Sequence, residues 1–135
     1  MKGYSENDIR STMSKADFDL YVAKKLISKA KNAKERGLSF EMTYAMMRNV
    51  LRSKRCFYTG VAIEPPVGDA TNLKLWNLTL DRIDASKGYV EGNVVACSYA
   101  FNQMKERVDS AGYVGMKLME KAFGKAAERI KAGSN

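Results

Sequence analysis

The stretch LTLDRIDASKGYVEGNVVACS, residues 78–98, decides the fold because it holds two short β-prone runs around a turn-rich segment. The runs are Leu78–Ile83 and Asn93–Cys97, and Gly, Asp and Ser are frequent between them. This order is typical of a β-hairpin with an extended loop. Phe101, Met104 and Val108 follow at helical spacing, so a helix is expected directly after the second strand.

The residues before the hairpin predict a helical lead-in. Phe18, Val22 and Leu26 recur at helical spacing from Ala16, and Gly37 is suited to end that helix as a left-handed cap. Leu38–Met42 alternates like an extended segment, and Thr43 can cap a second helix. Pro and Gly residues make 59–75 a connecting loop.

A last helix is expected after Asp109 or Ser110, either of which can cap it. Its apolar stripe steps by four along the chain: Val114, Leu118, Ala122, Ala126 and Ile130. Such a stripe is typical of core packing. The predicted class is α+β, mostly helical around a central hairpin–helix core, in one domain. It divides into a loose leader (1–15), a basic helical lead-in (16–55), the core (56–108) and a C-terminal helix (109–135).

Charge points to a polyanionic partner. The chain of 135 residues carries a formal net charge of +8. Residues 1–60 hold 13 Lys and Arg against 6 Asp and Glu, whereas residues 61–135 hold 10 against 9. A concentrated positive field suits nucleic acid, and DNA is expected before RNA. The alternative is that the charge only aids solubility. The residues expected to bind the phosphate backbone are Lys24, Lys25, Lys29, Lys31, Lys34, Arg36, Arg48, Arg52, Lys54 and Arg55.

Several classes of protein are disfavoured by composition. No run of eighteen apolar residues and no secretory leader is visible, so a cytoplasmic protein without a membrane partner is expected. Cys56 and Cys97 are too few for a disulfide framework or a closed four-ligand zinc site. They are expected to be small buried side chains that face one another. Tyr58 and Trp76 are expected to pack on the same apolar centre.

The spacing of residues 56–105 resembles phage and giant-virus HNH-type endonucleases, which carry a ββα-metal motif. The matching positions are Cys56, Thr59, Gly60, Leu80-Asp81-Arg82-Ile83-Asp84, Gly88-Tyr89, Asn93-Val94-Val95, Cys97, Asn102 and Met104-Lys105. One position departs from the pattern. Where the HNH pattern has Asp-His, this chain has Asp81-Arg82, and it contains no His anywhere.

The resemblance implies that Asp81 and Asn102 coordinate a single Mg²⁺ or Mn²⁺ ion and that Asn93 holds the loop. Oxygen ligands suit a hard divalent cation, whereas structural zinc is not expected. Asn93 after a glycine is equally a plain turn residue. Lys105 is expected to add a phosphate contact.

Arg82 cannot act as the general base because its guanidinium stays protonated. It can bind the scissile phosphate or form an ion pair with Asp81 or Asp84. The candidates for the base are Asp84, Tyr89 and hydroxide formed on the metal, and Tyr89 needs its pKa lowered from about 10.

Two functions therefore compete. One is a metal-dependent endonuclease encoded by a phage. The other is a catalytically silent module of the same fold that binds nucleic acid or a host or phage protein as a regulator or inhibitor. A basic structural protein is a third, weaker alternative.

Overall fold

The computed structural model describes residues 13–66 and 72–134. Most of the expected leader, residues 1–12, and part of the expected connecting loop, residues 67–71, lie outside the described residues. The chain divides into two compact units, one up to Asn102 and one from Gln103 onward. The fold is α+β, with five described helices and a small antiparallel sheet.

The first helix, α1 (Lys15–Glu35), begins where Ser14 accepts a hydrogen bond from the Asp17 amide at 3.0 Å. It ends before Gly37, whose φ of +68° is the left-handed conformation expected for a C-terminal cap. The Leu38 amide then donates to the Ala33 carbonyl at 2.8 Å and closes the last turn. The sequence prediction for this helix is therefore confirmed at both ends.

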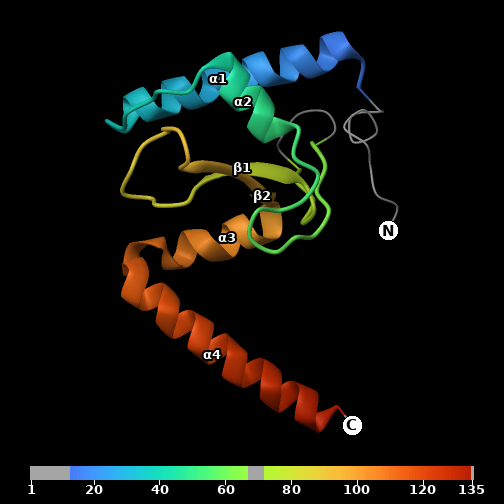
Figure 1. Ribbon diagram of the computed structural model, residues 1–135, viewed down its shortest axis with the longest axis vertical. Helices are drawn as coiled ribbons and strands as arrows, with labels where there is room; N and C mark the ends of the chain where they lie inside the picture. Colours follow the sequence, from blue (N-terminus) through green and yellow to red (C-terminus); the bar gives the residue numbers. More distant parts are fainter. Residues whose placement is uncertain (1–12, 67–71, 135) are drawn as a thin grey trace. The chain divides into compact units, whose positions relative to one another are not determined.

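The second helix, α2 (Tyr44–Leu51), starts as expected at Thr43, whose hydroxyl accepts from the Met46 amide at 3.2 Å. Both helices lie on the same side of the hairpin (Figure 1). They contribute part of the hydrophobic core, and the hairpin, its loop and the segments that precede and follow α2 add the rest. The buried apolar residues are Phe18, Val22, Ala33, Met42, Met47, Leu51, Cys56, Ile63, Leu78, Tyr89, Val94, Ala96 and Cys97.

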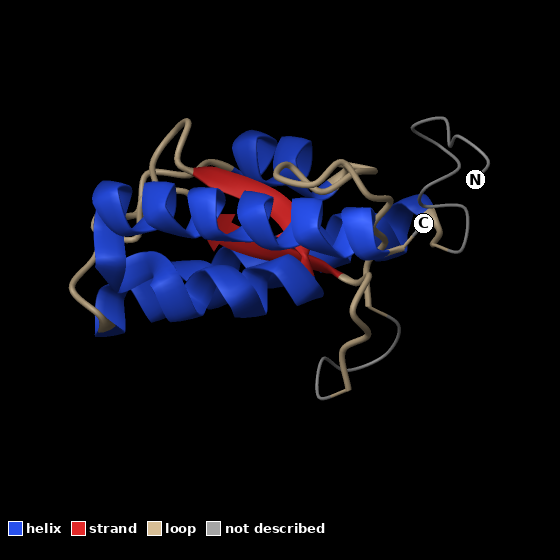
Figure 2. Ribbon diagram, turned by 90° about the horizontal axis from the view of Figure 1, so that it is seen from below, coloured by secondary structure: helices blue, strands red, loops and turns tan. Residues whose placement is uncertain are grey.

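The hairpin consists of β1 (Leu78–Arg82) and β2 (Val94–Ser98), drawn as red arrows in Figure 2. They pair antiparallel in a register that runs from Leu78 opposite Ser98 to Arg82 opposite Val94. Helix α3 (Tyr99–Val108) follows β2 without a connecting loop. The predicted hairpin–helix order is confirmed, and its direct β2–α3 junction fixes where the first turn of α3 lies on the strands.

The C-terminal unit differs from the sequence prediction in two ways. A short 3₁₀ turn, η2 (Asp109–Ala111), precedes α4 (Gly112–Gly133), and no side chain caps α4, so the expected Asp109 or Ser110 cap is wrong. None of the α4 residues is buried, although a core-packing stripe was expected there. The reason is that helical periodicity indicates an apolar face but does not identify what covers it.

A close backbone approach joins the hairpin loop to the segment after α1. The Tyr89 amide donates to the Ser39 carbonyl at 2.9 Å, and the Glu41 amide donates to the Tyr89 carbonyl at 2.8 Å. A Cβ atom added at Gly88 would lie 2.3 Å from the Ser39 carbonyl oxygen. Only glycine therefore allows the loop to reach this segment.

We expect Gly88→Ala to lower the free energy of unfolding by about 2–4 kcal/mol, because the methyl group meets backbone that cannot move aside cheaply. Urea unfolding followed by circular dichroism measures the loss. Gly92→Ala is the matched control: Gly92 has φ +83° and open space around it, so it should lose only about 1–2 kcal/mol from backbone strain. Equal losses of unfolding free energy in the two variants would show that the close approach of residue 88 to Ser39 adds nothing to the destabilisation.

Candidate active site

The site forms around a buried carboxylate, Asp81, near the end of β1. Its side chain belongs to a residue that is only 8% exposed. The Tyr58 hydroxyl donates to Asp81 Oδ2 at 2.5 Å. The Tyr58 ring packs on Phe101, with 4.6 Å between the ring centroids. A turn far upstream and β1 thus meet at the Asp81 carboxylate, and the first turn of α3 packs on the Tyr58 ring.

Tyr58 was expected only to pack, and its contact with Asp81 was missed from the sequence. It projects from the turn Cys56–Gly60, in which the Gly60 amide donates to the Cys56 carbonyl at 2.9 Å and Gly60 adopts φ +77°. The Phe57 amide donates to the Ala96 carbonyl at 2.9 Å and ties the turn to β2. This long-range pairing has no local sequence signal. Trp76, expected beside Tyr58 in the apolar centre, is instead 51% exposed.

Asn102 lies in the first turn of α3 and faces the same strand. Its Nδ2 donates to Thr79 Oγ1 at 2.9 Å and to the Leu80 carbonyl at 3.3 Å. Thr79 and Asp81 are two residues apart on β1, so their side chains share one face of the hairpin. The amide nitrogen of Asn102 thus donates two hydrogen bonds to β1. No hydrogen bond of Asn102 Oδ1 is seen among the described residues.

Arg82 points to the opposite face from Asp81, as the alternation of a strand requires. Its Nη1 donates to the Ala85 and Lys87 carbonyls, both at 2.6 Å. The guanidinium lies 5.6 Å from the centroid of the Tyr89 ring. Arg82 therefore closes the loop between the strands, on the face that carries Tyr89.

Asn93 fastens the same loop from its other end. Its Oδ1 accepts from the Asp84 amide at 2.9 Å, and its Nδ2 donates to the Gly88 carbonyl at 2.9 Å and the Asp84 carbonyl at 3.2 Å. The side chain is buried, so these bonds replace contacts with water. Asn93 and Arg82 together give the loop a defined conformation.

The two side chains expected as alternative bases are held in structural contacts. Asp84 Oδ1 accepts from the Ser86 amide at 3.0 Å and from the Ser86 hydroxyl at 2.6 Å, which is an Asx turn. Tyr89 is 6% exposed, and its ring lies 5.8 Å from that of Phe40. Neither contact involves the Asp81 carboxylate.

Both cysteines are buried free thiols. Burial raises the pKa of the Cys56 thiol, but hydrogen bonds from the Thr59 hydroxyl and from the backbone of Ser98, Thr59 and Tyr58 together outweigh it, and the net pKa is lowered. Cys97 Sγ lies 3.6 Å from Thr79 Oγ1. Among the described residues, no group of three or more His, Cys, Asp and Glu side chains gathers as metal ligands.

A positive cluster lies where α1 meets the loop side of the hairpin. We call Lys25, Lys29, Arg36 and Arg82 the basic cluster. Burial lowers the pKa of Lys29, and the charges of Lys25, Arg36 and Arg82 lower it further. Burial also lowers the pKa of Lys25. These side chains are close enough to repel one another, so an anion placed among them would be bound favourably.

The other expected phosphate-binding residues are more scattered. Lys24, Lys31 and Lys34 are exposed along α1. The Arg48 guanidinium lies 5.6 Å from the Phe18 ring centroid, and Arg55 Nη1 donates to the Gly60 carbonyl at 3.1 Å. Arg52 and Lys54 are partly buried. Lys105, expected to contact phosphate, is only 4% exposed and donates to Asp109 at 2.7 Å in an ion pair between residues four apart, which links the end of α3 to η2.

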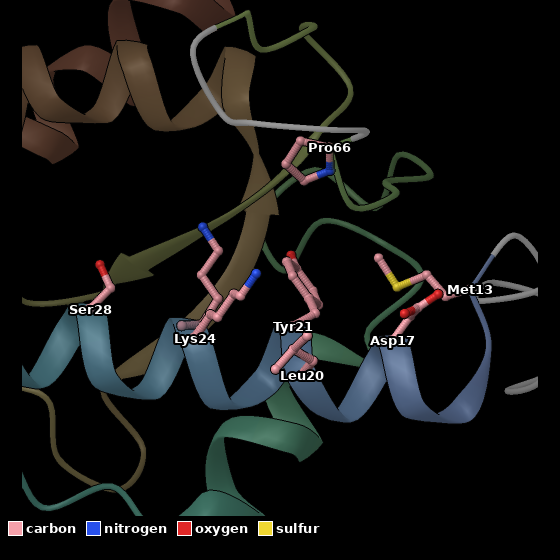
Figure 3. Close-up of a pocket in the computed structure, with 8 residues that line it drawn as sticks. Met13, Asp17, Leu20, Tyr21, Lys24, Ser28 and Pro66 are labelled. Atoms are coloured by element: carbon pink, nitrogen blue, oxygen red, sulfur yellow. The ribbon is translucent and has the colours of Figure 1, made fainter.

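A pocket of about 390 Å³ opens beside α1. Figure 3 shows side chains from successive turns of α1 on one side and Pro66 opposite them. Its lining includes Lys24 and Lys25 but also Asp17, so its charge is mixed. None of Tyr58, Asp81 and Asn102 lines this pocket.

No family model matches the chain. Over 90 residues, 67% of the chain, it is 28% identical to an uncharacterized 29.0 kDa protein of Enterobacteria phage T4 from the dda-modA intergenic region. The matched part is only 32% of that phage protein. The fold is similar to that of the rare-cutting HNH restriction endonuclease PacI, with a TM-score of 0.51, 17% identity and 93% of each chain covered. The chain therefore has an HNH-like fold.

We expect Asn93→Ala to lower the free energy of unfolding by about 2–4 kcal/mol, because it leaves the Asp84 amide and the Gly88 carbonyl without their partner in a buried loop. Urea unfolding measures the change, and limited proteolysis should cut the loop between the strands first. Ser86→Ala is the control, since Ser86 is exposed and its loss should cost under about 1 kcal/mol. An Asn93→Ala protein as stable as the control would contradict this account of the loop.

Proposed function

We propose that this protein is a divalent-cation-dependent endonuclease that hydrolyses phosphodiester bonds in nucleic acid, with DNA as the expected substrate. The observation that carries the proposal is the buried Asp81 carboxylate held by Tyr58, with Asn102 anchored to neighbouring residues of β1, on an HNH-like fold. The similarity to a phage protein is consistent with a phage origin.

The available oxygen atoms suit one hard cation. Asp81 supplies a carboxylate, and Asn102 turns its amide nitrogen to β1, which leaves its Oδ1 for a ligand. One carboxylate and one amide oxygen leave room for water and for phosphate oxygens around Mg²⁺ or Mn²⁺. Such an ion, when bound, lowers the pKa of coordinated water and offsets charge on the phosphate. The donor set does not suit structural zinc.

Tyr58 is the side chain that positions the Asp81 carboxylate. Its hydroxyl donates to Asp81, and its ring packs on Phe57 and Phe101. A general base must lie within hydrogen-bond reach of the water that it activates and must be able to accept its proton. Tyr58 is a protonated phenol that already donates to a carboxylate, so we assign it a positioning role and not the role of the base. The contacts of Asp84 and Tyr89 in the loop and the core do not favour either as the base.

In this proposal Arg82 orders the loop and adds positive charge, and it does not activate the attacking water. Its guanidinium orders the loop through two carbonyls and adds charge to the basic cluster. Phosphate contacts give most of the affinity of a protein for DNA. In this proposal the basic cluster and the exposed lysines of α1 hold the backbone of the substrate near the hairpin, and Asn93 keeps the loop rigid while they do so.

The alternative is a catalytically silent module that binds nucleic acid or a protein of host or phage. The absence of His and the use of the Arg82 guanidinium by loop carbonyls favour it. The two functions differ in turnover. They share the basic cluster, so binding alone does not separate them.

We expect the wild-type protein to nick plasmid DNA with Mg²⁺ or Mn²⁺ and to lose this activity with a chelator. Asp81→Asn should lower the single-turnover rate by at least about a hundredfold because it removes a charged ligand. Tyr58→Phe should lower it by about tenfold because it removes the hydroxyl that holds the Asp81 carboxylate in place. Both variants should still bind DNA. Gel-based nicking at saturating protein measures the rate.

The matched controls are Asp84→Asn and Tyr89→Phe, which make the same chemical changes in the two side chains that do not contact Asp81. They should retain rates within about threefold of wild type. Loss of activity in Tyr89→Phe with normal activity in Tyr58→Phe would show that Tyr89, and not Tyr58, acts at the site. Equal nicking by Asp81→Asn and wild type would show that Asp81 is not required for the cleavage. That result, or no turnover with either metal, would contradict the nuclease proposal and favour the silent binding module.

A separate prediction concerns the basic cluster. We expect Lys25→Gln combined with Lys29→Gln to weaken DNA binding and to reduce the slope of log Kd against log salt by about 2, because each phosphate contact contributes about 1. Fluorescence anisotropy with a duplex at several salt concentrations measures it. Lys121→Gln with Lys125→Gln, on exposed positions of α4, should leave the slope unchanged. The reverse pattern would place the DNA elsewhere.

A further inference from the structure

The two cysteines of the chain lie where the turn that carries Tyr58 meets β2. Cys56 is 2% exposed and Cys97 is fully buried. The Phe57 amide, next to Cys56 in the chain, donates at 2.9 Å to the carbonyl that precedes Cys97. The Ser98 amide, which follows Cys97 directly, donates to the sulfur of Cys56. The two thiols are therefore neighbours within the first compact unit, although they are far apart in the sequence.

Side chains of the candidate site flank both thiols. Cys56 lies two residues before Tyr58, whose hydroxyl donates to Asp81. Cys97 stands opposite Thr79 in the register of the hairpin, and its sulfur lies 3.6 Å from the Thr79 hydroxyl oxygen. Thr79 and Asp81 share one face of the hairpin, so Cys97 is on that face too. A change in the bonding of the two sulfurs would thus act close to the Tyr58–Asp81 contact.

The local geometry suits a bond between the two sulfurs. Disulfides join residues whose Cα atoms are roughly 4.4–6.8 Å apart. Residues that face one another across paired backbone segments are about 4.5–5.5 Å apart, and the pairing of the turn with β2 gives Cys56 and Cys97 this relation. The Thr59 hydroxyl and the amides of Tyr58, Thr59 and Ser98 lower the pKa of the Cys56 thiol. They favour the thiolate, which is the form that oxidants attack.

We propose that Cys56 and Cys97 form a reversible disulfide that acts as a redox switch on the Tyr58–Asp81 contact. The oxidant is a peroxide. The Cys56 thiolate attacks one peroxide oxygen, which gives a sulfenic acid and releases hydroxide. The Cys97 thiolate then attacks the sulfur of Cys56, the S–S bond forms and a second hydroxide leaves. The protons lost by the two thiols convert both hydroxides to water, so two thiols are oxidised and one peroxide is reduced.

The new bond changes the turn because it moves the sulfur of Cys56. Bonded sulfurs are about 2.05 Å apart, well inside van der Waals contact, so this sulfur is drawn away from its donors in the turn. The Tyr58 and Thr59 amides lose their acceptor, and Tyr58 is displaced from Asp81. The effect on cleavage rests on the proposed function, whereas the disulfide and the movement of the turn do not.

Peptide mapping of the full chain tests the pairing. After treatment with hydrogen peroxide, a digest without reductant should contain the Cys56 and Cys97 peptides joined by a disulfide. The protein should remain a monomer, and dithiothreitol should separate the two peptides. Disulfides between chains, or cysteines that stay as thiols or go on separately to sulfinic acid, would overturn the proposal.

Hydrogen exchange tests the movement of the turn. The Thr59 amide should exchange at least about tenfold faster in the oxidised protein than in the reduced one, because its acceptor has moved. The matched control is the oxidised sample after dithiothreitol, which reverses the disulfide but leaves any oxidised methionine as it is. In this control the exchange rate should return to that of the reduced protein. Equal exchange in the disulfide and dithiol forms would overturn the switch.

The nicking rate tests whether the disulfide acts through Tyr58. Oxidation should slow wild-type nicking by about tenfold, as expected for Tyr58→Phe, and should not slow the Tyr58→Phe variant further. Dithiothreitol should restore the wild-type rate. An equal loss in both proteins would show that the disulfide acts elsewhere and would overturn the switch. If the reduced wild type does not nick, the nuclease proposal fails, and the exchange of the Thr59 amide still decides the switch.

Discussion

The burial of Asp81 constrains the whole site. A carboxylate withdrawn from water is costly unless hydrogen-bond donors or a cation compensate it. Here Tyr58 supplies a donor from a turn more than twenty residues upstream. That single bond requires the turn Cys56–Gly60 to lie against the hairpin, and the turn achieves this through the backbone pairing of Phe57 with Ala96. The buried carboxylate and this backbone bond therefore hold the turn against the hairpin.

The pleat of β1 separates the two residues that stand where the HNH pattern has Asp-His. Adjacent residues on a strand point to opposite faces, so Asp81 and Arg82 lie in two different environments. Asp81 accepts from Tyr58 on the face of the hairpin that Asn102 contacts, whereas Arg82 lies beside the loop and Tyr89. The arginine donates to two loop carbonyls and orders the loop between the strands. Its side chain therefore has a structural role on the face opposite to Asp81.

Local signals in the sequence predicted the elements but not the contacts between distant segments. Helix α1, its Gly37 cap, the Thr43 cap and the hairpin–helix order follow from spacing and from residues that favour caps and turns. The position of Asn102 on the face of β1 follows from the direct β2–α3 junction. Tyr58 could not be assigned, because its role depends on the pairing of Phe57 with β2 across almost forty residues.

The lowered pKa of Lys29 connects the fold to the proposed substrate. Burial lowers this pKa first, and the positive charges of Lys25, Arg36 and Arg82 add to the effect. Since the folded pKa lies below the unfolded value, the protonated lysine opposes folding at neutral pH, and this penalty fades only as the pH rises toward the unfolded pKa of about 10.4. In the proposed complex, a phosphate placed among these charges would offset their mutual repulsion and favour the protonated form of Lys29. The repulsion within the basic cluster thus opposes folding of the free protein, and a bound polyanion would relieve it.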